Sequence, residues 1–489
     1  MGIVRDQSIK NSFSFYIGML IGAINTVILY PNVFQENPEH LGLIQILIAY
    51  AVFVATFTTI GIPKTFLRFF PAIKNKGQLF FLSLVVPLFG FISSLLFYFF
   101  FKESLFDLLN VGELLRNNFY YVFILVFFIG FYEILTSVSR SYLNAAVPIF
   151  INEVFMKLYS LILLLLHWFS YLQFDSFLSF YISGYIIKFG VLLCIQLYHN
   201  RLCFSFTLKE LRLKEMFVYG LYVLLAGASI MIVTRLDMIM IGSLLDLEQV
   251  AFYTIAYFIG NAIKVPSKSI ASISVPLLAK AWEEQDFKQI NTLYVKSSIN
   301  QLIIGGILFL CMWINIDSVF NLLPSEFSQG KWVVFFIGIS QLFNISTGIN
   351  GPIIVNSKYY RYDLVTNIIL VVVTIISNYI LIQKFGINGA AMATALSIFI
   401  FSLVRLIIIK IKMNLQPFNI KTIYTILILL VVYFIISSFP VIGIPLIDIA
   451  WRSILVFLFF TPLILLLRLS EDIIDVINII LKKILFRKS

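Results

Sequence analysis

The sequence has few charged residues and very few cysteines and histidines for its length. Of its 489 residues, 12% are charged, three are cysteine and three are histidine. Cys194, Cys203 and Cys311 lack the spacing of a metal-ligand set and suggest no disulfide framework. We therefore expect no bound metal and no cofactor.

The sequence contains long runs of apolar residues, which a soluble protein would interrupt with charged residues. Hydrophobic residues make up 60% of the chain, and the mean hydropathy is +0.98. The runs are about 20 residues long, which is the length that a helix needs to cross a hydrocarbon core of about 30 Å. The composition predicts an all-α polytopic membrane protein.

We expect about fourteen transmembrane helices. Basic residues mark loops that stay in the cytoplasm, and with the N-terminus inside, the basic clusters at 64–76, 201–214, 410–421 and 482–488 all lie on the inner side. Both termini are then cytoplasmic, and the net charge of +11 favours anionic lipid over nucleic acid as a partner. The expected spans are 11–30, 42–63, 79–101, 119–139, 151–171, 177–197, 216–242, 249–272, 292–314, 330–352, 363–383, 389–409, 422–443 and 449–468.

The order of the spans indicates an internal repeat. We expect an N-terminal six-helix lobe at 1–206, a cytoplasmic connector at 207–215 and a C-terminal six-helix lobe at 216–413. Two further helices and a cytoplasmic amphipathic tail fill 414–489. Within the connector, Thr207 and Glu210 have the spacing of a capping box, which predicts a short helix there.

Three motifs carry a family resemblance. Residues 386–395 read Gly-Ile-Asn-Gly-Ala-Ala-Met-Ala-Thr-Ala, Asn350-Gly351 precedes the segment 356–360, and Asp237 opens the segment 237–242 with Tyr253 beyond the next loop. Small residues alone would indicate only close helix packing. Together the motifs resemble those of polysaccharide flippases in the multidrug/oligosaccharidyl-lipid/polysaccharide exporter superfamily.

The resemblance implies a function in the bacterial inner membrane. A member of that family would move undecaprenyl-diphosphate-linked oligosaccharide outward by alternating access of two lobes, for a surface polysaccharide such as the O-antigen of lipopolysaccharide. Its partners would be this lipid-linked sugar, membrane lipid, a coupling ion (proton or sodium) and other polysaccharide-assembly proteins.

Three alternatives stay open. A drug or cation antiporter of the superfamily usually has twelve spans, which disfavours that branch. A lipid II flippase would be expected to have arginines in its first two spans, yet residues 11–63 contain neither Lys nor Arg. A membrane polysaccharide polymerase would need catalytic carboxylates in outer loops, where acidic residues are scattered and form no metal-ligand cluster. We therefore expect a protein that is not an enzyme.

Charged residues inside the second-lobe spans are the first candidates for a site, because a charge in a membrane helix usually faces a bundle interior or a wet cavity. Arg235 and Asp237 lie about 200° apart around their helix and must face different surfaces. Lys264 and Lys268 share a face at i,i+4. Either Asp237 neutralises one lysine while the other reaches the interface, or both line a cavity that attracts a diphosphate.

The first lobe offers further candidates. Glu133 and Arg140 share one face of the fourth span with Ser137 between them, and Glu133 is either a coupling carboxylate or half of a structural pair. Lys188 either reaches the inner interface or faces the cavity. Asn25 is the strongly polar residue of the first span, where such a residue more often joins helices than binds a ligand. Glu153 and Lys157 are spaced for a local ion pair.

Overall fold

The computed structural model describes residues 2–209 and 211–475, and every regular element in these ranges is a helix. The predicted all-α fold is confirmed. The chain divides into two compact units, residues 1–255 and residues 256–489. Each unit is described by itself.

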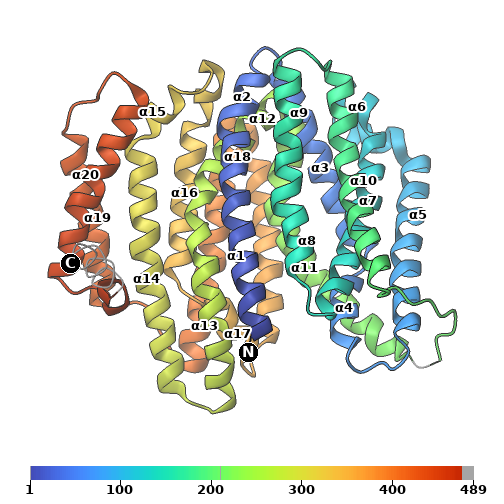
Figure 1. The fold of residues 1–489 in the computed structure, drawn as a ribbon. Coiled ribbons are helices and arrows are strands. Elements are labelled where there is room, and N and C mark those ends of the chain that lie inside the picture. The colour runs from blue at the N-terminus through green and yellow to red at the C-terminus, as the bar shows by residue number, and fades with distance from the viewer. Residues whose placement is uncertain (1, 210, 476–489) are drawn as a thin grey trace, which may run out of the picture. The chain divides into compact units, whose positions relative to one another are not determined.

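Unit 1 is a bundle in which the first span is broken by a π-helical turn. Helix α3 packs against α5, α7 and α11, and α10 packs against α7 and α9 (Figure 1). The elements are α1 (Gly2–Ala23), the π-helix η1 (Ile24–Leu29), α2 (Tyr30–Val33), α3 (Pro38–Thr58), α4 (Ile62–Phe69), α5 (Lys76–Leu108), α6 (Glu113–Asn118), α7 (Tyr120–Ser141), α8 (Ala146–Phe150), the π-helix η2 (Ile151–Phe155), α9 (Met156–Trp168), α10 (Phe174–Tyr198) and α11 (Leu213–Leu244).

Unit 2 is built around α14, α16 and α18. Helix α16 packs against both α14 and α18, and α14 also packs against α13, α19 and α20 (Figure 1). The elements are α12 (Leu247–Asn261), which begins in unit 1, the 3-10 helix η3 (Ala262–Lys264), α13 (Val265–Glu283), α14 (Phe287–Ile314), α15 (Ile316–Phe320), the 3-10 helix η4 (Ser325–Gly330), α16 (Lys331–Ser346), α17 (Asn350–Asn356), α18 (Arg361–Met413), α19 (Ile420–Ser437) and α20 (Pro445–Leu466).

The helices make this a multi-pass membrane protein. Within the described residues, ten helices are long and apolar enough to cross a membrane, or up to twelve if each of two bent pairs forms one span. All fourteen expected ranges lie mostly on helix, and 42–63 and 330–352 cross non-helical breaks at 59–61 and 347–349. Two other ranges lie on α18, which breaks at Gly386 with a φ of 57°, and 249–272 covers α12, η3 and α13. The count of fourteen, the orientation of the termini and the lobe boundaries stay predictions.

The connector differs from its prediction. Residues 207–209 and 211–212 are not helical, and α11 begins only at Leu213, so the predicted short helix is wrong for these residues. Glu210 lies outside the described residues. The Thr207 hydroxyl accepts a hydrogen bond from Gln78 Nε2 at 3.0 Å, which ties the connector to α5 in place of capping a helix.

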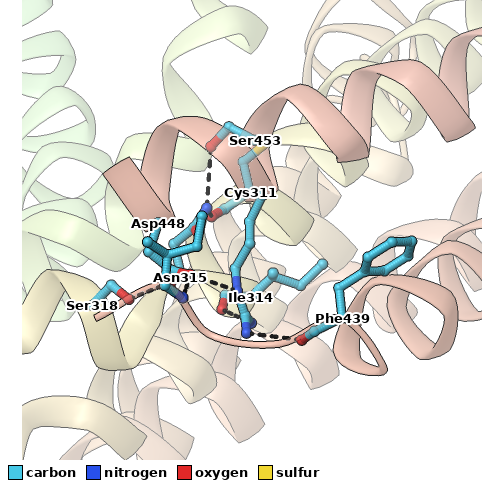
Figure 2. Close-up of polar contacts among 9 residues, drawn as sticks. Cys311, Ile314, Asn315, Ser318, Phe439, Asp448 and Ser453 are labelled. Carbon is cyan, nitrogen blue, oxygen red and sulfur yellow. Dashed lines mark hydrogen bonds and ion pairs between the residues drawn. The ribbon is translucent and has the colours of Figure 1, made fainter. Parts of the chain in front are cut away.

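Helices α19 and α20 join unit 2 through an apolar cluster and one buried ion pair. Val432, Ile436 and Phe460 pack with Leu310 and Ile314 of α14. Figure 2 shows the polar contacts at the start of α20. Amphipathic residues of the tail beyond 475 lie outside the described residues.

The ion pair joins Asp448 and Arg452, whose exposed fractions are 1% and 8%. Arg452 Nε donates to Asp448 Oδ1 at 3.2 Å, and its Nη1 and Nη2 donate to the carbonyls of Ile314 and Phe439 at 3.4 and 3.3 Å. The Ser318 hydroxyl donates to Asp448 Oδ2 at 2.6 Å (Figure 2). Both charges are thus satisfied by several partners.

Candidate functional site

The two charges of α11 lie in different surroundings. Asp237 is 2% exposed and accepts a hydrogen bond from the Tyr253 hydroxyl at 2.6 Å. Arg235 is partly exposed. This is the separation that helical geometry requires for positions two residues apart. The expected pairing of Asp237 with Lys264 stays a prediction.

Arg235 lies beside two tyrosines of α10. Its guanidinium acts electrostatically on the phenols of Tyr181 and Tyr185. The phenols of Tyr30, Tyr181 and Tyr185 also act on one another electrostatically. Arg235 and these three phenols therefore belong to one polar neighbourhood of unit 1.

Lys188 is the most deeply buried of the candidate cations, with 5% of its surface exposed. Its Nζ lies 4.6 Å from the ring centroid of Tyr132 and 4.5 Å from that of Tyr185. It donates to Asn152 Oδ1 at 3.3 Å. Glu133 and Glu153 act on it electrostatically, but no ion pair found within the described ranges includes Lys188.

One face of α10 presents Lys188 and the tyrosines together. Successive members of this face are three or four residues apart, so they lie one above another along the helix. The ring centroids of Phe174 and Phe177 are 6.5 Å apart, those of Phe177 and Tyr181 are 6.1 Å apart, and those of Tyr181 and Tyr185 are 6.3 Å apart. The Lys188 ammonium lies over the Tyr185 ring at the end of this row. We call this face the α10 stripe; it consists of Phe174, Phe177, Tyr181, Tyr185 and Lys188.

Asn25 joins the first and fifth spans beside the stripe. Its Nδ2 donates to the carbonyl of Lys157 and to the hydroxyl of Ser160, both at 2.8 Å. Asn25 lies on η1, and Glu153 lies on η2, which are both π-helical. Such turns occur often at functional sites. The predicted pair of Glu153 with Lys157 is confirmed, with 2.9 Å between Oε2 and Nζ.

Two glycines of α1 let it lie close to this pair. A Cβ on Gly18 would come within 2.4 Å of the Glu153 carbonyl oxygen, and one on Gly22 within 3.3 Å of Lys157 Cδ. The two glycines are four residues apart and face the same way. The first span therefore covers the Glu153–Lys157 pair directly.

The remaining candidates are exposed. Glu133 and Arg140 are exposed on α7, and the Ser137 hydroxyl between them donates to the Glu133 carbonyl at 3.0 Å. Lys264 and Lys268 belong to unit 2, where both are exposed and act on each other electrostatically. Lys264 closes the 3-10 turn η3, which breaks the eighth expected span.

Sequence reasoning missed the aromatic residues around Lys188. The stripe was visible as Tyr181, Tyr185 and Lys188 at i, i+4 and i+7, which places them on one helix face. Tyr132 and Asn152 come from α7 and η2, and no local pattern links them to Lys188. The break at Lys264 had a signal in Pro266, because proline is favoured at the start of a helix.

A family model for polysaccharide biosynthesis proteins matches residues 7–282. The chain belongs to this family. The resemblance to polysaccharide flippases carried by the sequence motifs agrees with this membership. No curated protein sequence matches the chain significantly.

The fold is shared with solved membrane transporters. The inward closed structure of the lipid II flippase MurJ matches with a TM-score of 0.69 and 17% identity, over 93% of this chain and 97% of the other. An inward-facing multidrug resistance MATE transporter of the same superfamily matches with a TM-score of 0.64 and 14% identity, over 83% and 98%. A transporter from Pyrococcus furiosus matches with 0.58 and 13%, over 83% and 95%. The chain is thus a member of a polysaccharide biosynthesis family that has the fold of these transporters.

Proposed function

We propose that the protein moves an undecaprenyl-diphosphate-linked oligosaccharide from the inner to the outer leaflet of the bacterial inner membrane, for synthesis of a surface polysaccharide. Membership of the polysaccharide biosynthesis family and the fold shared with a lipid II flippase support a lipid-linked substrate. The protein forms no covalent intermediate in this process; it binds, changes conformation and releases.

The single observation that carries the proposal is the surroundings of Lys188. Taking an ammonium ion out of water costs several kcal/mol, and a cation–π contact returns about 2 kcal/mol when desolvated. The direct contacts of Lys188 are two tyrosine rings and one amide oxygen, and Glu133 and Glu153 act on it without forming an ion pair within the described ranges. An anionic group that reached it would be bound favourably.

Arg235 supplies a second cation for the same ligand. Both Lys188 and Arg235 act on Tyr185, one through the ring and the other on the phenol. A diphosphate carries two phosphoryl groups, and two cations that both act on one tyrosine match its charge. In the proposed mechanism Lys188 and Arg235 hold the diphosphate, and Tyr181 and Tyr185 donate hydrogen bonds to it.

The other candidates have supporting roles in the proposal. Lys264 and Lys268, exposed and mutually repelling, attract the anion in unit 2. Asp237 and Asn25 hold helices in place. The carboxylates Glu133 and Glu153, together with Arg140, set the electrostatic surroundings of the bound diphosphate. Alternating access of the two lobes then exposes the site to either side, driven by a proton or sodium gradient.

The decisive experiment measures transport by the purified protein in vesicles. Undecaprenyl-diphosphate-linked oligosaccharide is loaded into one leaflet, and its arrival in the other is followed under imposed proton or sodium gradients. We expect transport that depends on the protein and on one of the gradients. If the lipid-linked sugar stays in its leaflet under every gradient, the proposed function is wrong.

A site test uses Lys188→Met, Lys188→Arg and Arg235→Gln. A charge-assisted hydrogen bond contributes about 1.5–3 kcal/mol, so the neutral variants should lose transport about tenfold or more, and Lys188→Arg should lose less. Lys102→Gln, in an exposed position near the end of α5, is the matched control. Unchanged transport in both neutral variants, at equal expression, would remove the α10 stripe from the mechanism.

Lipid II is the second candidate substrate, because the MurJ structure matches over nearly the whole chain. Lipid II also carries a diphosphate, so the two candidates predict the same effect of Lys188→Met. A parallel arm of the vesicle experiment with lipid II separates them: the proposal expects faster movement of the oligosaccharide.

A further inference from the structure

The two ends of α18 are tied together by a partly buried ion pair. Gly386 divides α18 into a first half that begins at Arg361 and a second half that ends at Met413. Asp363, near the beginning, and Arg405, near the end, form an ion pair that is largely shielded from solvent. Asn367 Nδ2 also donates to Asp363 Oδ2 at 3.2 Å, and Arg405 Nε donates to the Thr366 hydroxyl at 3.4 Å. The carboxylate of Asp363 is thus fully occupied.

Gly351 of helix α17 allows the Arg405 guanidinium to approach that helix closely. A Cβ on Gly351 would lie 2.7 Å from Arg405 Nη1, and the guanidinium carbon lies 4.0 Å from the ring centroid of Phe401. Ile353 and Ile354 of α17 pack with Ile409 and Tyr362 of α18 in one apolar cluster. The ion pair therefore fixes α17 and both ends of α18 as one rigid group.

This rigid group carries two lysines on two tyrosine rings. Lys358 Nζ lies 5.2 Å from the Tyr359 ring centroid, and Lys412 Nζ lies 5.9 Å from that of Tyr362. The two rings are 6.3 Å apart, which makes the four side chains one continuous surface. Both lysines are exposed. We call Lys358, Tyr359, Tyr362 and Lys412 the tyrosine–lysine patch.

The turn that bears the patch is held by hydrogen bonds. Ser357 is buried, its hydroxyl accepts from the Tyr359 amide at 3.0 Å, and its carbonyl accepts from the Tyr360 amide at 3.3 Å. The Tyr362 amide donates to the Tyr359 carbonyl at 3.0 Å. The spacing of the two rings is therefore built into the backbone.

The patch has no negative partner in its own part of the chain. From residue 327 to residue 447 the sequence contains one acidic residue, Asp363, and Arg405 occupies it. Just after the neighbouring helix α13, Glu284 pairs with Lys280 of that helix. The same stretch, 327–447, has eight basic residues: Lys331, Lys358, Arg361, Lys384, Arg405, Lys410, Lys412 and Lys421. No ion pair in the described part of the chain includes Lys358 or Lys412, so an anion from outside the chain can supply their counter-charge.

The geometry points to the tyrosine–lysine patch as a binding surface for the phosphate of an anionic phospholipid head group in the inner leaflet. The predicted topology puts this end of α18 at the inner surface, where tyrosine side chains sit at head-group level. Ammonium groups and phenol hydroxyls both donate hydrogen bonds to phosphate. This inference concerns ordinary membrane lipid and does not depend on which substrate is transported.

The test titrates the purified full-length chain in neutral detergent with phosphatidylglycerol, phosphatidylcholine and inorganic phosphate, and follows binding by the rise in melting temperature. We expect phosphatidylglycerol to bind more tightly than the other two ligands. Each lysine near an anionic surface contributes about a fivefold change in affinity, so Lys358→Gln with Lys412→Gln should weaken phosphatidylglycerol binding about thirtyfold.

Two matched variants make the result specific. Lys384→Gln removes one exposed charge from the middle of the same element and should leave binding unchanged, and Lys358→Arg with Lys412→Arg should retain most of it. Each variant is compared at its own ligand-free melting temperature, which corrects for altered folding. Equal binding of phosphatidylcholine, equal binding of inorganic phosphate, or full binding by the double Gln variant would each overturn the inference.

Discussion

Buried cations in this protein fall into two kinds, distinguished by their partners. Arg452 and Arg405 each have a carboxylate beside them, Asp448 and Asp363. Lys188 contacts tyrosine rings and an amide oxygen, and Glu133 and Glu153 act on it without an ion pair in the part of the chain that the structure describes. A buried charge with its full set of partners holds helices together, whereas one without an acidic partner retains affinity for an anion. This contrast is the reason for assigning the substrate to Lys188.

Removal of one partner tests the first kind of cation. In Asp448→Asn the Arg452 guanidinium stays buried without a carboxylate, which costs about 3–5 kcal/mol for a buried pair. We expect a clearly lower melting temperature for the purified protein in detergent. Asp175→Asn, an exposed position in the first turn of α10, is the control. A melting temperature equal to that of the control would show that the Asp448–Arg452 pair contributes little to stability.

The pH dependence of stability tests a charge outside the membrane. Burial raises the pKa of Asp472, but hydrogen bonds from Lys296 and Asn300 outweigh it and hold the pKa below its usual value of 3.8. Lys296 Nζ donates at 2.8 Å, and Asn300 Nδ2 donates at 2.8 Å. Because the folded-state pKa is lowered, this stabilisation is complete above about pH 4 and is lost as the pH falls through the folded-state value.

Melting temperature measured from pH 6 to pH 3 should show the effect. Relative to the wild type, Asp472→Asn should be less stable at pH 6, and the difference should shrink towards pH 3. A constant difference across that range would mean that the titration of Asp472 does not contribute.

At the scale of elements, glycines set the closeness of helices in unit 1. A Cβ on Gly42 of α3 would come within 1.8 Å of the Leu247 carbonyl oxygen at the start of α12, and one on Gly242 of α11 within 2.2 Å of Ile46 Cδ1. Contacts this short with backbone cannot be relieved by a side-chain rotation. The seam of α3 with α11 and α12 therefore depends on Gly42.

Gly42→Ala should separate these helices. Overpacking typically costs about 1–3 kcal/mol, and we expect a lower melting temperature together with reduced transport. Gly190→Ala on α10 is the matched control, because nothing lies within 4 Å of its Cβ position; alanine there should be neutral or stabilising, by up to about 1 kcal/mol. Equal stability of the two variants would contradict the close seam.

Sequence patterns predicted the positions of the helices well and their breaks poorly. Hydrophobic length alone located mostly helix in the fourteen ranges, because each apolar run must satisfy its own backbone in lipid. The π-turn at Asn25 and the 3-10 turn at Lys264 leave hydropathy unchanged. The connector helix expected after Thr207 failed for a related reason: the contact that replaces it, with Gln78, joins residues far apart in sequence.

At the scale of the whole molecule, the candidate site shows the same limit. Lys188 and Arg235 could be named from sequence because charge in an apolar span is conspicuous. Their surroundings could not, because Tyr132, Asn152 and Tyr185 come from three different helices. The family match and the shared fold say which class of protein this is, and neither selects between the candidate cations.

The orientation of the chain in the membrane is open to a direct test on α18. Lys358 precedes α18, and Lys384 lies just before its break at Gly386. The predicted topology puts residue 358 inside and residue 384 outside. We expect Cys at 384, in a variant with Cys194, Cys203 and Cys311 changed to Ser, to react with a membrane-impermeant maleimide in intact cells. Cys at 358 should react only after permeabilisation. If both positions react from the same side, residues 363–383 do not span the membrane. If the pattern is reversed, the topology is inverted, and the assignment of the tyrosine–lysine patch to the inner leaflet is wrong.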